Sequence, residues 1–201
     1  MPAGYEGQFR GRSCTVLRGR REYGLDGVAD NVLRLTVRDA EEADVPALTA
    51  IKGDGSEALH RDRLRDAQGR GLRYLVLTVD HELIAFACLV FRRPAYWSDA
   101  NDTSHLPQIV DLQVQERQRG RGYGSAFVRA LERIAVAAGY GQLYLRVDPL
   151  NNPRAYALYE RLGYQQLQSE PYRKAWEFKD SAGQVHRGED WAVDMVKLLK
   201  G

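Results

Sequence analysis

A chain of 201 residues with 44% hydrophobic and 28% charged residues has the composition of one soluble globular domain. The formal net charge of +2 at pH 7 excludes binding to nucleic acid or to membranes that is driven by overall charge. The longest apolar run, 83–91, has nine residues, whereas a helix needs about 20 to cross a bilayer.

The first 32 residues differ from the rest of the chain. They are rich in glycine and arginine and have no sustained helical or strand periodicity. We interpret residues 1–32 as a loosely ordered extension with one short strand near 14–17, because chain termini are poorly ordered unless something holds them. A basic arm that contacts phosphate or a partner subunit is the alternative. We predict a single globular domain over residues 33–201.

Hydrophobic periodicity and turn residues predict the elements of this domain. Its first half contains, in chain order, a strand at 33–38, a helix after Asp44, a charged helix at 56–67, and a hairpin of strands 74–79 and 83–91. A polar segment, 92–107, precedes the second half. That half contains a strand at 109–114, a helix at 125–138, a strand at 142–147, a helix at 152–162, and closing strands at 164–167 and 191–199 with a hairpin around 180–184 between them. This order is typical of a mixed α/β domain with a partly antiparallel sheet.

The segment 117–125, Arg-Gln-Arg-Gly-Arg-Gly-Tyr-Gly-Ser, joins the strand at 109–114 to the next helix. Glycines let backbone N–H groups approach a ligand closely, and the N-terminus of a helix attracts anions. Together with three arginines, this indicates a phosphate site. A nucleotide P-loop would need a lysine after the glycines, and a dinucleotide fingerprint would need a different third interval, so neither fits.

The pattern Arg119-x-x-Gly122-x-Gly124 resembles the acyl-coenzyme-A-binding motif of the GCN5-related N-acetyltransferase (GNAT) family. A second block matches the following helix of that family: Asn152-x-x-Ala155-x-x-Leu158-Tyr159-Glu160-x-x-Gly163-Tyr164. The resemblance covers residues 33–164. It implies the GNAT acyl-CoA N-acyltransferase fold, a mixed and mostly antiparallel sheet flanked by helices, whose central pair of parallel strands splays apart. It also implies acetyl-CoA as the acyl donor.

The resemblance assigns donor-binding roles to both blocks. Backbone groups of Leu112, Gln113 and Val114 would pair with pantetheine, and the N–H of Val114 would meet the thioester carbonyl. The pyrophosphate would be held by Arg119, Gly120, Arg121, Gly122, Tyr123, Gly124 and Ser125. The second block would add Asn152, Ala155 and Tyr159. For Asn152 the alternative role is to cap its helix.

Two residues are the candidates for catalysis. By resemblance, Tyr159 would protonate the leaving thiolate; a phenol of pKa about 10 beside a thiol of about 8.5 is a workable acid, and burial in the core is the alternative. Asp111 lies inside an apolar strand, where an acid is costly to bury without a partner. We predict that it is a base or a substrate anchor, with a structural ion pair as the alternative. Gln108 stands where many relatives have a glutamate, and an amide cannot accept the proton.

The acceptor pocket is expected between the first two helices, the polar segment and the last hairpin. Its candidate residues are Glu57, His60, Tyr96, Trp97, Asp99, Asp102, Tyr172 and Trp176. Acidic and aromatic groups suit a cationic amine, although the same residues could anchor loops or contact a subunit. All four histidines are predicted to lie at the surface: His60, His81, His105 and His186.

We therefore predict an N-acetyltransferase that moves the acetyl group of acetyl-CoA to a primary amine on a small molecule or peptide. Neither Cys14 nor Cys88 falls in the motifs, so we expect direct attack in a ternary complex without a covalent enzyme intermediate. The alternative is a non-catalytic acyl-CoA-binding or regulatory module with the same fold. No residue spacing is typical of a metal site, and we expect no nucleic-acid or membrane partner. The sequence has no visible secretory signal, which predicts a cytoplasmic protein, and a homodimer stays open.

Overall fold

The computed structural model describes residues 34–69, 71–92, 103–179 and 185–200, together with the backbone of three strands nearer the N-terminus. The strands are β1 Glu6–Phe9, β2 Arg12–Val16, β3 Glu22–Leu25, β4 Leu35–Asp39, β5 Leu72–Val79, β6 Glu82–Val90, β7 Gln108–Val114, β8 Gln142–Val147, β9 Gln165–Gln166, β10 Tyr172–Lys179 and β11 Val185–Leu198. The α-helices are α1 Val45–Lys52, α2 Glu57–Asp66, α3 Tyr123–Ala137 and α4 Pro153–Arg161. No described helix is long and apolar enough to cross a membrane.

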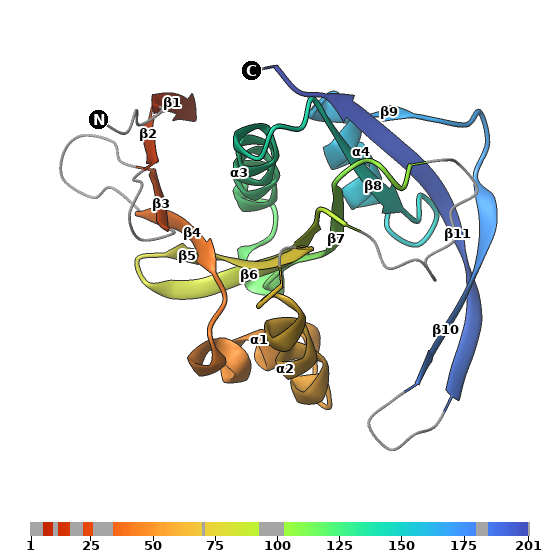
Figure 1. Cartoon of the computed structure of the whole chain (residues 1–201), viewed down its shortest axis with the longest axis horizontal. Helices are drawn as coiled ribbons and strands as arrows, with labels where there is room; N and C mark the ends of the chain where they lie inside the picture. Colours follow the sequence, from red (N-terminus) through yellow and green to blue (C-terminus); the bar gives the residue numbers. More distant parts are fainter. Residues whose placement is uncertain are drawn as a thin grey trace.

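The described strands form one sheet in the order β1-β2-β3-β4-β5-β6-β7-β8-β11-β10, with β9 beside β11 (Figure 1). Its neighbours are antiparallel except β7 and β8, which are parallel. The fold expected from the resemblance to GNAT enzymes is confirmed. Three strands occupy the N-terminal segment in which the sequence predicted one, and β2 lies at the predicted place. The division into an extension and a domain stays a prediction.

The predicted helices and strands of residues 33–201 are all present, and most of their ends agree within one or two residues. The largest difference is β11, which begins at Val185 because it pairs with β10 along the whole of that strand. The turn between β5 and β6 is made by Asp80 and His81, both with positive φ values of 47° and 71°. Such values are typical of a tight hairpin turn.

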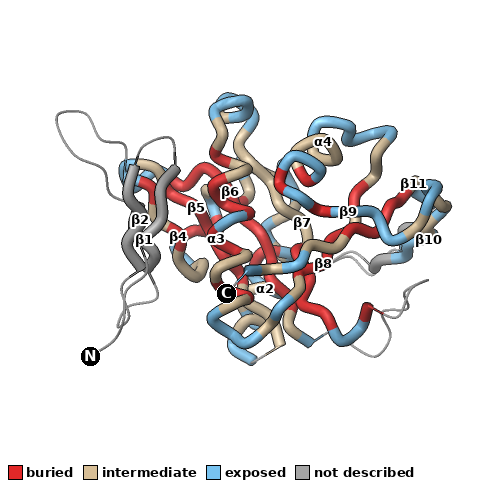
Figure 2. The backbone as a smooth tube through the Cα atoms, turned by 90° about the horizontal axis from the view of Figure 1, so that it is seen from above, coloured by how far each residue is buried: buried red, intermediate tan, exposed pale blue. Residues whose placement is uncertain are grey.

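The central strands are buried on both faces because helices cover both sides of the sheet. On one side, α3 and α4 pack against a cluster that includes Leu75 and Leu77 of β5. On the other side, α1 and α2 pack against Tyr74 and Val76 of the same strand. This alternation follows the two-residue period of a strand, and Figure 2 shows that β5 and β6 are mostly buried. We call the two sides the α3/α4 face and the α1/α2 face.

The parallel strands β7 and β8 are joined along a short stretch. Within the described residues they pair at Gln108 with Tyr144 and at Ile109 with Leu145, and at no later position. Beyond Ile109 the edge of β7 that faces β8 therefore has no strand partner. This is the splayed arrangement that the resemblance implied.

β7 is also irregular at Asp111. Its pairing with β6 shifts register between Phe86 and Cys88, and Asp111 has a φ of 49°, a left-handed conformation that is uncommon outside glycine. Val110 packs on the α1/α2 face, and the carboxylate of Asp111 contacts side chains of the same two helices. Two successive side chains thus point to one face, which is the signature of a β-bulge. Leu112 then returns to the α3/α4 face.

Candidate active site

The glycine-rich turn presents backbone N–H groups at the start of α3. Gly120 and Gly122 have φ values of 77° and 89°, which glycine adopts without the penalty that other residues pay. Gly122 is the residue before the helix, and no side chain caps the helix there. Because the first N–H groups of a helix have no partner within it, those of the first turn from Tyr123 remain available to an anion.

The three arginines of the turn have different surroundings. Arg117 forms an ion pair with Glu82 at the β5–β6 hairpin. Arg119 donates from Nε to the backbone carbonyl of Val114 at 3.0 Å. Within the described part of the chain, Arg121 is exposed and has no ion-pair partner. Arg121 is therefore the guanidinium that is most available to a phosphate.

The two sequence blocks meet in space at Gly124. A methyl group placed on Gly124 would lie 3.5 Å from Cδ2 of Leu158 and 3.8 Å from Cγ2 of Val114. The first turn of α3 thus lies against both the end of β7 and the middle of α4. Segments about 35 residues apart along the chain form one continuous surface on the α3/α4 face.

The open edge of β7 carries the backbone groups of Val114. The next residue, Gln115, donates its N–H to the carbonyl of Ile84 in β6 at 2.8 Å. Because successive residues of a strand direct their backbone groups to opposite edges, the N–H and carbonyl of Val114 point away from β6. The contact between that carbonyl and Arg119 agrees with this direction. By the same alternation Leu112 faces the open edge, whereas the backbone of Gln113 faces β6.

Tyr159 of α4 is buried among apolar side chains on the α3/α4 face, with 7% of its surface exposed. Its ring packs edge-to-face against Tyr164 at a centroid distance of 5.8 Å. Burial raises the pKa of Tyr159 to about 12, so the phenol is protonated at neutral pH. Ala155, one turn earlier, is partly buried in the same cluster.

Asn152 precedes the first residue of α4, and its side chain makes no capping hydrogen bond. The preceding turn is instead held by Asp148, whose Oδ1 accepts the N–H groups of Leu150 and Asn151, both at 2.9 Å. The capping role that the sequence left open for Asn152 is therefore absent. Its exposed amide is free to bind a ligand.

On the α1/α2 face, Asp111 contacts two cations. Lys52 donates to its Oδ2 at 2.8 Å, Arg63 Nη1 lies 2.7 Å from the same oxygen, and Gln113 donates to Oδ1 at 2.9 Å. Burial alone would raise the pKa of Asp111, but the charge of Arg63 and the contact with Lys52 outweigh burial, and the pKa is lowered below its ordinary value. Asp111 is therefore an ionised and weakly basic carboxylate. The sequence analysis did not identify Lys52 or Arg63.

The prediction that His60 lies at the surface is wrong: His60 is fully buried on the inward side of α2. Its Nδ1 lies 2.7 Å from the hydroxyl of Tyr74, and its Nε2 lies 3.2 Å from the hydroxyl of Ser56. Burial, with the nearby charges of Arg63 and Lys52, lowers the pKa of His60 to about 4, so it is neutral at pH 7. The spacing of His60, Leu64 and Ala67, in α2 and directly after it, is the sequence pattern that indicates an inward-facing stripe. The many charged residues of this helix obscure that pattern.

The other residues expected at the acceptor pocket are scattered. Glu57 is exposed and pairs with Arg61, and Trp176 lies across Gly188, where any added side chain would overlap the indole. Tyr172 donates to Asp194 at 2.9 Å. Tyr96, Trp97, Asp99 and Asp102 lie outside the described residues, as does the side chain of His186. His81 and His105 are exposed, as predicted.

The sequence analysis also missed a buried carboxylate on β11, Asp194. It is fully buried and accepts hydrogen bonds from Tyr144, from Arg146 Nε at 2.8 Å and from Tyr172. These donors lower the pKa of Asp194, although burial alone would raise it. Asp194 therefore joins β8, β10 and β11 on the same side of the sheet as α1 and α2.

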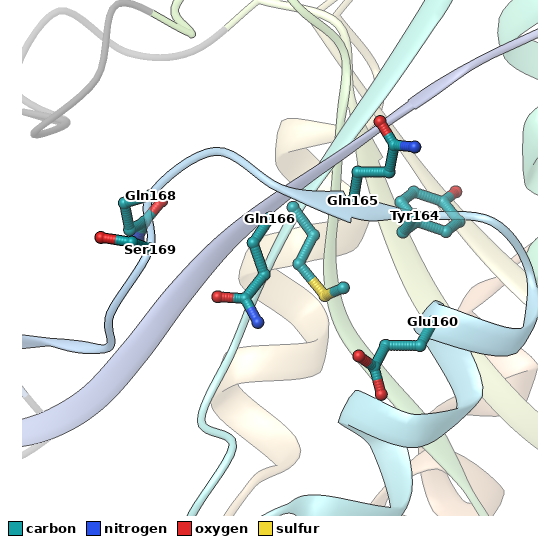
Figure 3. A pocket seen from close by; sticks show the side chains of 7 residues that line it. Glu160, Tyr164, Gln165, Gln166, Gln168 and Ser169 are labelled. Carbon is teal, nitrogen blue, oxygen red and sulfur yellow. The ribbon is translucent and has the colours of Figure 1, made fainter.

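A surface pocket lies where α4 meets β9 and β11 (Figure 3). Its lining residues are Glu160, Tyr164, Gln165, Gln166, Gln168, Ser169 and Met195. None of them belongs to the predicted donor-binding set, and the lining contains no cation for a pyrophosphate. The pocket is therefore separate from the glycine turn.

Comparison with known proteins agrees with this geometry. Residues 37–164 match the model of the family described as acetyltransferase (GNAT) family. The ribosomal-protein-S18-alanine N-acetyltransferase of Escherichia coli is 20% identical, with a TM-score of 0.57 over 83% of this chain and 95% of that one. A putative acetyltransferase of Salmonella typhimurium, solved with acetyl-CoA, is 16% identical, with a TM-score of 0.57 over 83% and 94%.

A spermidine N-acetyltransferase chimera from Vibrio cholerae is 18% identical, with a TM-score of 0.58 over 82% of this chain and 95% of that one. At these identities the solved structures show a shared fold. The match to the family model carries the assignment, because it spans most of the chain and includes both sequence blocks. The protein belongs to the GNAT acetyltransferase family, and it is an acyltransferase.

Proposed function

We propose that the protein transfers the acetyl group of acetyl-CoA to a primary amine by direct attack in a ternary complex. The observation that carries this proposal is the meeting of three features: the open edge of β7 at Val114, the uncapped start of α3, and the buried phenol of Tyr159 on α4. Backbone donors for a thioester and for a pyrophosphate then lie on one continuous surface with an acid for the leaving group.

For the donor, we propose that pantetheine lies along the open edge of β7, with Asn152 as a side-chain partner. The pyrophosphate would lie against the N–H groups of the segment 119–125, and Arg121 would add charge. The N–H of Val114 would donate to the thioester oxygen as the amine attacks the carbonyl carbon. Arg119 already occupies the carbonyl of Val114, so the N–H is the group left to bind substrate. Of the three residues predicted to pair with pantetheine, we propose this role for Leu112 and Val114 only, because the backbone of Gln113 faces β6.

Tyr159 is the proposed acid. When the carbon–sulfur bond breaks, its hydroxyl would give a proton to the thiolate of coenzyme A. A phenol of pKa about 12 is a weaker acid than an ordinary thiol by about 3.5 pKa units. Taken alone, this difference opposes proton transfer from Tyr159 to the thiolate. The same apolar surroundings raise the pKa of a thiol bound beside Tyr159, and this brings the two groups closer together.

The attacking amine must be neutral, whereas an alkylamine of pKa about 10.4 is deprotonated about once in 2,500 molecules at pH 7. Asp111, held ionised by Lys52 and Arg63, is a poor acceptor for its proton. We therefore propose for Asp111 the alternative role that the sequence analysis gave, a structural ion pair, which holds Lys52 and Arg63 in place. The positive charges of Lys52 and Arg63 lower the pKa of an ammonium group bound beside them, which favours the reactive neutral form.

The test is a panel of amines incubated with acetyl-CoA, with release of free thiol as the signal. The panel contains amino acids, a peptide with a free N-terminus, polyamines and aminoglycosides. We expect at least one amine to give thiol release that requires both the protein and the amine. Thiol release that never exceeds the rate without amine would contradict the proposed transfer.

A further inference from the structure

Two cations share one carboxylate at the bulge of β7. Lys52 at the end of α1 and Arg63 in α2 both contact Oδ2 of Asp111. The side chains are only 24%, 15% and 18% exposed, respectively. Within the described residues, this cluster therefore carries one excess positive charge in a largely desolvated place, where an uncompensated charge is costly.

Arg63 retains hydrogen-bonding capacity. Its Nη1 lies 2.7 Å from Oδ2 of Asp111 in an ion pair, yet this buried nitrogen has no partner that meets hydrogen-bond geometry among the described residues. The neighbouring imidazole of His60 responds to the same excess charge: after burial, Arg63 and Lys52 are the largest causes of its lowered pKa, and Asp111 offsets them only in part. An additional anion would satisfy both the charge and the unpaired donor.

The position of the cluster relates it to the acceptor rather than to coenzyme A. Asp111 and Gln113 project to the α1/α2 face, whereas Val114 and the glycine turn are part of the α3/α4 face. Asp111 is only three residues from Val114 along β7. A substrate that reaches the thioester from the α1/α2 side therefore meets Lys52 and Arg63 first.

We propose that the acceptor is an amine that also carries a carboxylate, and that Lys52 and Arg63 bind this carboxylate. The inference rests on the proposed acetyl transfer and names its substrate class. A monoanion matches the single excess charge of the cluster, and the guanidinium of Arg63 suits a carboxylate. A polyamine would bring further positive charge to a site that is already positive. The acidic pocket expected from the sequence relied on residues 96–102, outside the described residues, and on Glu57, which pairs with Arg61.

The test compares alanine with two analogues, alaninamide, in which an amide replaces the carboxylate, and ethylamine, in which a hydrogen replaces it. Acetyl-CoA is saturating, and the rates are compared at equal concentrations of neutral amine. We expect kcat/KM for alanine to exceed that for both analogues by about 10- to 100-fold, the range for hydrogen bonds to a charged group. Lys52→Gln and Arg63→Gln should each reduce this preference by at least about 10-fold. The readout is the ratio of kcat/KM for alanine to kcat/KM for ethylamine, so an effect of the substitution that is common to both amines cancels.

Arg61→Gln is the matched control, because Arg61 lies on the same helix but pairs with Glu42 and Glu57 at the surface; it should retain the preference. Acetyl-CoA affinity, measured by calorimetry, should be unchanged in all three variants, which verifies folding. If none of the three amines is turned over, the affinities of two products for the protein–CoA complex are compared instead. These products are N-acetylalanine, which has the carboxylate, and N-ethylacetamide, which lacks it. The same preference for the carboxylate is expected there.

Several results would overturn the inference. One is equal use or binding of ligands with and without a carboxylate. Another is a preference for spermidine. A third is a preference for aminomethylphosphonate over glycine, which would indicate a site for phosphate. Acetylation of spermidine alone would leave the proposed transfer intact while rejecting the carboxylate. Absence of acetyl-CoA binding would instead reject the proposed transfer itself.

Discussion

On the α3/α4 face of β7, the candidate site consists mainly of backbone: the N–H of Val114, the turn around Gly122, and the start of α3. On the α1/α2 face, it consists of side chains that three separate elements bring together, namely Lys52, Arg63 and Asp111. The first kind of site depends on strand geometry and glycine conformation, which do not change with pH. The second depends on ionisation and on the relative placement of α1, α2 and β7. The backbone site suits the acyl donor that we propose, and the side-chain site suits the acceptor amine.

The largest expected effect comes from removing the charge of Asp111. Asparagine tolerates the left-handed backbone of this position, so Asp111→Asn leaves Lys52 and Arg63 buried without their counter-ion. We expect the free energy of unfolding at pH 7 to fall by about 3 kcal/mol. Because the folded pKa is lowered, this stabilisation is present above the unfolded pKa of about 3.9 and is lost as the pH falls below it.

Urea unfolding at pH 7 and pH 3 checks this prediction. The curves of wild type and Asp111→Asn should differ at pH 7 and approach each other at pH 3. Asp62→Asn is the control, since Asp62 forms an exposed pair with Arg65 that contributes little. Equal stability of Asp111→Asn and wild type at pH 7 would show that the α1/α2 side does not depend on this ion pair.

The next effect tests Tyr159, the side chain that we propose as the acid for the leaving thiolate. Tyr159→Phe should lower kcat by about 100-fold, since general acid catalysis contributes at least that much, while the Kd for acetyl-CoA stays within about twofold. Tyr164→Phe is the matched control, because its ring packs against Tyr159 but its hydroxyl has no assigned role. Steady-state kinetics with a saturating amine measures both. An unchanged kcat in Tyr159→Phe would favour another proton donor, or the acyl-CoA-binding module without catalysis.

The third prediction separates the role of the glycine turn in acetyl-CoA binding from the backbone strain that any substitution of a left-handed glycine causes. Gly122 and Gly139 lie at opposite ends of α3 with φ values of 89° and 92°. Alanine at either position should cost about 1 to 2 kcal/mol in stability. Only Gly122→Ala should also weaken acetyl-CoA binding, by about 10-fold as expected for one weakened charge-assisted contact. Calorimetry and urea unfolding on both variants separate the two effects; equal affinities would show that the turn is only a connection.

The smallest effect concerns Asn152. If its amide binds pantetheine, Asn152→Ala should raise the KM for acetyl-CoA about three- to fivefold, consistent with a net contribution of about 1 kcal/mol from one hydrogen bond. Stability should change by less than about 0.5 kcal/mol, since no capping bond is present to lose. A loss of stability with an unchanged KM would assign Asn152 to the helix instead of the ligand.

The arrangement of the proposed donor site could be predicted from the sequence because its signals are local. The residues from Val114 to Ser125 are contiguous, and glycine spacing within them reports the backbone conformation directly. Asn152 and Tyr159 followed from the second block, which lies on a single helix. The strands and helices of residues 33–201 followed from periodicity for the same reason.

The acceptor side could not be predicted, because its contacts join distant positions. Lys52 and Asp111 are 59 residues apart, and their contact depends on the bulge that turns Asp111 towards α1 and α2. No local pattern marks that bulge. His60 was placed wrongly because the charged residues of α2 obscure its buried stripe. Of the three N-terminal strands, β1 and β3 were missed because glycine and arginine dominate their segment.

Calorimetric titration of the full chain with acetyl-CoA tests the central claim most directly. The claim is that the open edge of β7 and the glycine turn form a donor site. We predict saturable binding of one acetyl-CoA per chain, weakened in Gly122→Ala and retained in Gly139→Ala. Absence of saturable binding to the folded wild-type protein would contradict the account.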